Sequence, residues 1–218
     1  MKTKLILLAV LFVSNFQSFN SLAGEYEEAM NKGIEMLNQA NDNQSATEAA
    51  NYFERVSESA KNEWLPLYYA AYASLKTGFY QDKPELKDTW YLKGISLSER
   101  ASAIAKNESE IYALEAYLRL MYISNDPMKR AEEHTGLAIG LLEKSKALDP
   151  TNPRPWFIQG QNTLYTPEFF GGGSEKARPI IEKANELFAT FKPVNSLMPD
   201  WGKPQCDKLM AKVSEEKK

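Results

Sequence analysis

The chain has 218 residues, 43% of them hydrophobic and 11% aromatic, which is enough for one domain or one repeat array with a sizeable core. Its formal net charge of −3 argues against nucleic acid or an anionic membrane surface as a partner, because either would need a basic patch. The chain has one cysteine, so it cannot form an internal disulfide. One cysteine and one histidine are also too few ligands for a zinc site. We therefore expect no cofactor and no metal.

The first 23 residues have the features of a secretory signal peptide. Lys2 and Lys4 precede an apolar run at 5–13, and the small-residue pattern at 21–23 stands directly before Gly24. The apolar run is about half of the roughly 20 residues that a membrane-crossing helix needs. We predict cleavage after residue 23, a mature chain over 24–218 without a membrane span, and export to the periplasm or the medium.

After this segment, apolar residues recur at helical spacing and no alternating strand pattern appears, so the predicted fold class is all-α. Asp126 before Pro127 and Asn152 before Pro153 each place a capping side chain ahead of a proline, which is favoured in the first helical turn. Connections between the predicted helices are mostly short, which favours antiparallel neighbours. The helices are predicted near 25–40, 46–60, 62–76, 84–106, 108–124, 127–147, 153–165, 175–191 and 203–213.

The stretch "AIGLLEKSKALDPTNPRPWFIQG" combines small and bulky residues at fixed offsets within a helix-turn-helix pattern. These residues are Ala138, Leu142, Leu148, Pro150, Trp156 and Gly160, followed after an insertion by Ala177, Ile181 and Ala184. The pattern resembles the tetratricopeptide (TPR) repeat family, most clearly over 138–191, with degenerate units from residue 45 as in exported bacterial members. The resemblance implies a TPR-like α-solenoid: a right-handed superhelical stack of about 8–9 antiparallel helices in a single domain, with a capping helix near 203–213.

Three consecutive glycines interrupt the clearest repeat in "FFGGGSEKA". A nucleotide-binding phosphate loop needs a preceding strand and a Gly-Lys-Ser/Thr ending, whereas here Lys176 comes after Ser174 and Glu175. We predict a chain reversal between the two helices of one hairpin, with a positive φ at one glycine or more. The Ser174 hydroxyl is expected to cap the second helix.

No catalytic constellation emerges from the sequence. Cys206 lies on an apolar helical stripe and is predicted to be buried. His134, the single histidine, is expected to be half-buried with a local hydrogen bond. Adjacent acidic pairs such as Glu132 and Glu133 do not converge on one point of a helix. We therefore expect that the protein is not an enzyme.

A binding function is the class that remains. In repeats of this kind the first helix of each hairpin lines a concave groove, so the resemblance implies that a partner binds there. The aligned groove positions are Asn62, Tyr69, Tyr72, Glu110, Tyr117, Arg154, Phe157, Gln161 and Tyr165. Aromatic rings mixed with a few polar groups suit a peptide or protein segment. The leading hypothesis is a non-catalytic exported scaffold for an unidentified protein or peptide. The alternative is a small-molecule binder, a helical accessory of a transport system that holds an apolar solute.

Overall fold

The structure is a computed structural model that describes residues 24–215. The predicted signal peptide therefore lies outside the described residues. Within them every regular element is helical, which confirms the all-α prediction. After an N-terminal helix at 24–39, the elements are α2 (Asn43–Ser59), α3 (Leu65–Phe79), α4 (Pro84–Ile104), α5 (Ser109–Asn125), α6 (Pro127–Leu148), α7 (Arg154–Tyr165), the 3-10 turn η1 (Glu168–Phe170), α8 (Ser174–Thr190) and α9 (Lys203–Glu215).

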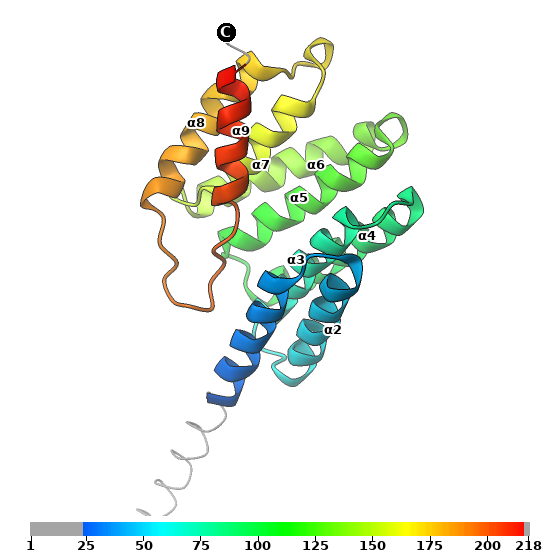
Figure 1. The fold of residues 1–218 in the computed structure, drawn as a ribbon, viewed down its shortest axis with the longest axis vertical. Coiled ribbons are helices and arrows are strands. Elements are labelled where there is room, and N and C mark those ends of the chain that lie inside the picture. The colour runs from blue at the N-terminus through cyan, green and yellow to red at the C-terminus, as the bar shows by residue number, and fades with distance from the viewer. Residues whose placement is uncertain (1–23, 216–218) are drawn as a thin grey trace, which may run out of the picture.

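Successive helices stack as antiparallel hairpins along one axis, as Figure 1 shows. Helices α3 and α4, α5 and α6, and α7 and α8 pair within hairpins, and α2 packs on α3 as α4 packs on α5. The last helix, α9, lies along α8 and covers the end of the stack with Leu209 and Val213. This arrangement confirms the predicted stack of helix hairpins.

Helix ends are set by local chemistry. The Asp42 carboxylate accepts a hydrogen bond from the Ser45 backbone N–H at 2.8 Å and begins α2 as a capping box. The Asn152 side chain accepts from the backbone N–H of Arg154 at 2.9 Å, but Pro153 occupies the N-cap position of α7, one residue after the predicted cap. The predicted cap at Asp126 is wrong, because this side chain makes no capping hydrogen bond and instead pairs with Lys129 one turn along α6.

The glycine loop joins the antiparallel helices α7 and α8, so the predicted chain reversal is confirmed. Gly171 and Gly173 have φ angles of 89° and 95°, which disfavour any residue with a Cβ. Gly172 is required for another reason: a Cβ there would lie 1.9 Å from the Thr166 carbonyl oxygen. Gly173, which has no side chain to cap with, occupies the N-cap position of α8, so the capping position predicted for Ser174 is wrong.

Replacing Gly171 with valine is expected to lower the free energy of unfolding by about 1–2 kcal/mol, because a β-branched residue must adopt a left-handed backbone there. A Cβ at Gly171 would meet only the Lys176 side-chain nitrogen, at an ordinary contact distance of 3.9 Å, so the loss reports backbone strain rather than a clash. Gly136→Val in α6 is the matched control, since that Cβ meets no atom within 4 Å and stands on helical backbone. Equal urea midpoints for the two variants would contradict this account of the loop.

Candidate functional site

The chain segment between α8 and α9, residues 191–202, which we call the strap, lies against the helices expected to line the groove. Figure 1 shows it as a long loop that leaves the end of α8 and returns to the start of α9. The Tyr69 hydroxyl of α3 donates a hydrogen bond to the Leu197 carbonyl oxygen at 2.8 Å. An Arg154 guanidinium N–H of α7 donates to the Pro199 carbonyl oxygen at 2.6 Å. The strap thus bridges two helices of the predicted groove.

Trp201 is the strap residue that enters the aromatic cluster of the groove. Its indole stacks on the Tyr72 ring with centroids 4.8 Å apart, and its Nε1–H donates to the Tyr68 hydroxyl at 2.8 Å. The rings of Tyr117 and Phe157 lie 6.2 and 6.5 Å from the indole. A tryptophan held by one hydrogen bond and three ring contacts fills space that a bound peptide side chain would otherwise occupy.

Arg154 anchors the same segment from the side of α7. It is fully buried, and its guanidinium donates to the Glu110 carboxylate at 2.8 Å as well as to the carbonyl of Pro199. The rings of Phe191 and Trp201 lie 4.8 and 5.2 Å from the guanidinium carbon. Because a buried charge needs a partner, this ion pair ties α5, α7 and the strap together.

The carboxylate of that ion pair has a second contact, since the Tyr68 hydroxyl lies 3.4 Å from Glu110 Oε2. Burial raises the pKa of the Glu110 carboxyl, and the positive charge of Arg154 opposes this shift. Both the acidic and the basic partner are used within the fold. The pair therefore has no free charge to offer a ligand.

Most of the predicted groove residues lie beneath the strap or within the core. Five of them are buried: Tyr69, Glu110, Tyr117, Arg154 and Phe157. Tyr72 and Gln161 are partly buried, Tyr165 is 61% exposed, and Asn62 lies apart in the loop after α2. Tyr117 donates to the Gln161 side-chain oxygen at 3.0 Å. A role for these positions in partner binding stays a prediction. The positions beneath the strap already contact other residues of the same chain.

Trp201 was not among the predicted groove residues. The signal available in the sequence is the apolar content of "NSLMPDWGKP", a segment rich in proline and glycine that nevertheless carries Leu197, Met198 and Trp201. Loops usually run over the surface, so large apolar side chains in this segment indicate that it packs against the rest of the protein.

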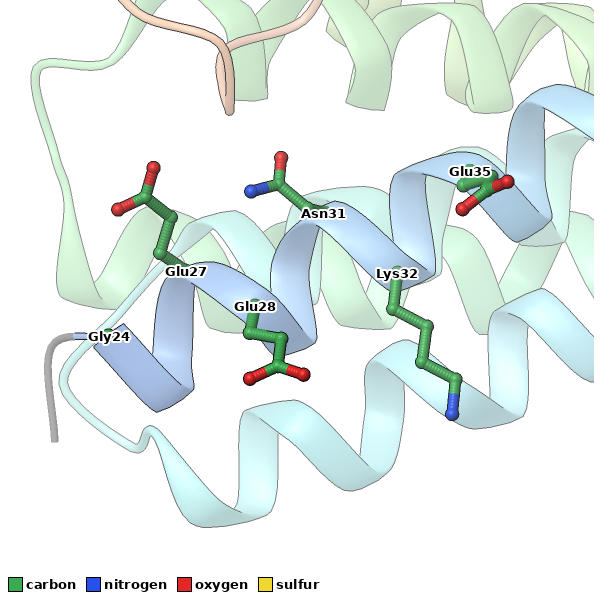
Figure 2. Close-up of a pocket in the computed structure, with 6 residues that line it drawn as sticks. All are labelled: Gly24, Glu27, Glu28, Asn31, Lys32 and Glu35. Atoms are coloured by element: carbon green, nitrogen blue, oxygen red, sulfur yellow. The ribbon is translucent and has the colours of Figure 1, made fainter. Parts of the chain in front are cut away.

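One cavity lies on the exposed face of the N-terminal helix. It has a volume of about 490 Å³ and is lined by six residues of that helix, shown in Figure 2: Gly24, Glu27, Glu28, Asn31, Lys32 and Glu35. Glu27 and Asn31 point to one side of the helix, whereas Glu28 and Lys32 point to the other. These groups do not converge, and three of the six lining residues are acidic against one lysine, so the surface offers no anion or apolar-ligand site.

A second cavity of about 520 Å³ lies between the strap and the start of α5. Its charged lining consists of Glu108, Glu110, Asp149 and Lys192. Glu110 is paired with Arg154, which leaves two carboxylates, Glu108 and Asp149, against one lysine and makes this cavity unsuitable for a ligand that carries acidic groups.

A third cavity, which we call the Tyr26 cavity, opens between the first described turns of the N-terminal helix, the end of α2 and the α2–α3 loop. Its volume is about 690 Å³. Its lining combines two tyrosines, small apolar residues and two cations: Glu25, Tyr26, Ala29, Tyr52, Arg55, Val56, Ser59, Ala60, Lys61, Asn62 and Glu63. Asn62 is the one predicted groove residue on its wall.

The structure also places the single cysteine and the single histidine of the chain, Cys206 and His134. Cys206 is fully buried, as predicted, and burial raises the pKa of its thiol to about 11. His134 is half-buried, as predicted, with its ring edge-on to Tyr122 at 5.4 Å, but the expected hydrogen bond is absent at its buried Nδ1. Within residues 24–215, no group of three or more His, Cys, Asp or Glu side chains could hold a metal ion.

No protein-family model and no curated protein sequence matches this chain. Among solved structures, it is similar to the HusA haemophore from Porphyromonas gingivalis, with 27% identity, a TM-score of 0.78, and coverage of 88% of this chain and 94% of that one. It is also similar to a thermophilic TPR protein from Thermus thermophilus, with 13% identity, a TM-score of 0.64, and coverage of 88% and 82%. Both likenesses support the TPR-like helical fold. None of the described helices combines the length and apolar character that a bilayer crossing requires.

Proposed function

We propose that this protein is a non-catalytic exported carrier of a haem-class ligand, meaning a flat apolar ring system that bears carboxylate groups. The observation that carries the proposal is the likeness to the HusA haemophore, which extends over nearly the whole length of both chains. The TPR protein, at 13% identity, supports the fold alone. The proposal therefore takes the small-ligand alternative of the sequence analysis in preference to the peptide scaffold.

The geometry of the groove favours this choice. A peptide that entered the groove would have to displace Trp201 from Tyr72 and break the hydrogen bonds that Tyr69 and Arg154 make to the strap. A small ligand needs no such rearrangement, because the Tyr26 cavity has a volume of about 690 Å³. That value lies within the roughly 300–1,000 Å³ typical of small-molecule sites.

Haem added stepwise to the chain that begins at residue 24 is expected to give a shifted Soret band that saturates at one equivalent. The expected dissociation constant is on the order of 1 µM or lower, as for a dedicated small-ligand site. Saturating haem should also raise the melting temperature, because a ligand that binds only the native state stabilises it.

The same titration in urea above the unfolding midpoint is the control, and the shifted band should be absent there. Absorbance that grows linearly, as for haem in buffer alone, would contradict the proposal. Stoichiometric recovery of a polypeptide with the native protein, together with no haem binding, would instead support the peptide scaffold.

A further inference from the structure

We infer that the Tyr26 cavity is the site at which this protein holds its flat, carboxylate-bearing ligand, with the Tyr26 hydroxyl as its buried polar contact and Arg55 and Lys61 as partners for the ligand's carboxylates. The inference rests on the proposed function for the class of ligand. The location of the site is inferred separately, from the residues that line the cavity.

The wall of the cavity offers a positioned aromatic surface. The Tyr52 hydroxyl donates to the Ala29 carbonyl oxygen at 3.1 Å, which ties α2 to the N-terminal helix and limits rotation of the ring. Phe53 lies edge-on to Tyr52 at 6.1 Å and packs in the core behind it. Val56 adds apolar surface to the same wall. A flat ring system can stack on or against such a surface with little cost in side-chain entropy.

The Tyr26 hydroxyl is buried and has no hydrogen-bond partner within the described residues. Buried hydroxyls are normally satisfied, so on a cavity wall this hydroxyl offers a hydrogen bond that a ligand atom can complete. Burial raises the pKa of Tyr26, and the negative charge of Glu63 raises it further. The phenol is therefore neutral at physiological pH and available as a hydrogen-bond donor.

The two cations of the cavity are not used in ion pairs with the part of the chain that the structure describes. Arg55 and Lys61 are exposed, and neither forms a salt bridge with any described residue. Arg55 lies over the Tyr52 ring, 5.7 Å from its centroid, which holds the guanidinium beside the aromatic wall. A ligand carboxylate that meets these side chains gains charge-assisted hydrogen bonds. Glu25 and Glu63 also line the cavity, so the carboxylates of a bound ligand would face the cations rather than these acids.

The other candidate locations in the described chain lack this combination. The concave groove is filled by Trp201, and its arginine is already paired with Glu110. The cavity beside the strap carries three carboxylates, and the one on the N-terminal helix has no aromatic wall. The Tyr26 cavity alone among these joins aromatic surface, unpaired cations and an orphaned donor.

The test is haem titration, followed by Soret absorbance, on variants of the chain that begins at residue 24. Tyr26→Phe should weaken haem binding by roughly 3- to 10-fold through the lost hydrogen bond. Its melting temperature should not fall, because the hydroxyl has no partner among residues 24–215 of the free protein. Loss of binding with unchanged stability separates a ligand contact from a structural role.

Two further variants probe the charge and the space of the cavity. The double substitution Arg55→Gln with Lys61→Gln should weaken haem binding by about 10-fold or more. Ala60→Trp should reduce it strongly by occupying the cavity. The charge-matched control, Lys192→Gln with Lys208→Gln, removes two exposed lysines that do not line the cavity and should bind haem as the parent does.

The outcomes separate the site from the function. If the parent chain binds haem and all the cavity variants bind it equally well, the Tyr26 cavity is not the site, although the proposed function stands. If the charge-matched control weakens binding as much as the cavity double variant, the effect is one of net charge and the assignment also fails. If the parent chain binds no haem, the proposed function itself is overturned.

Discussion

Replacing Arg154 with methionine is expected to lower the free energy of unfolding by about 3–5 kcal/mol, the cost of leaving a buried charge without its partner. The substitution keeps much of the side-chain volume but strands the Glu110 carboxylate, which is 6% exposed. It also removes the donor to the Pro199 carbonyl oxygen and hence a tie between α7 and the strap. Urea denaturation followed by far-ultraviolet circular dichroism measures the effect.

The matched control is the double variant Arg154→Met with Glu110→Gln. A neutral amide is much less costly to bury than an unpaired carboxylate, and Tyr68 remains within reach as a partner, so the double variant should recover part of the lost stability. A double variant as unstable as Arg154→Met alone would show that charge pairing is not the reason for the loss. The cost would then come from packing against Phe191 and Trp201.

Trp201→Ala is expected to cost about 3 kcal/mol of unfolding free energy, at the lower end for loss of a large aromatic side chain because the indole is only partly buried. The substitution removes the stack on Tyr72 and the hydrogen bond to Tyr68, which are two of the strap's contacts with α3. Trp201→Phe retains a ring but not the hydrogen bond, so its cost should be smaller. Thermal denaturation of the three proteins tests this order.

The same variant bears on the location of the ligand. Because Trp201 contacts the groove and not the Tyr26 cavity, haem affinity of Trp201→Ala measured well below its melting temperature should stay within about twofold of the parent. A loss of tenfold or more would place the ligand on the concave face and contradict the assignment to the Tyr26 cavity.

Helical periodicity and proline positions were sufficient to predict the elements of this fold. Pro84 and Pro127 each stand in the first turn of a helix that begins where the sequence indicated, α4 and α6. The glycine loop was likewise predictable. It lacks the preceding strand and the Gly-Lys-Ser/Thr ending of a phosphate loop, so a turn between two helices was the remaining interpretation. The distinct reason for Gly172, its close approach to Thr166, depends on tertiary geometry and could not be predicted.

The candidate site was less predictable, because it depends on contacts between distant parts of the chain. The repeat alignment selected Tyr69 and Arg154, and both donate hydrogen bonds to the strap. It could not show that the chain fills this face itself, since Tyr68 and Trp201 are 133 residues apart and the strap has no periodicity. The Tyr26 cavity was missed because its tyrosines lie in the first hairpin, where the repeat pattern is weakest.

The most direct test of the proposed function is a crystal structure of the chain that begins at residue 24, grown with one equivalent of haem. We predict planar density in the Tyr26 cavity, with a polar atom of the ligand within hydrogen-bonding distance of the Tyr26 hydroxyl and carboxylates near Arg55 and Lys61. Crystals that contain the folded chain and no bound haem, at haem concentrations well above the expected micromolar dissociation constant, would contradict the central claim.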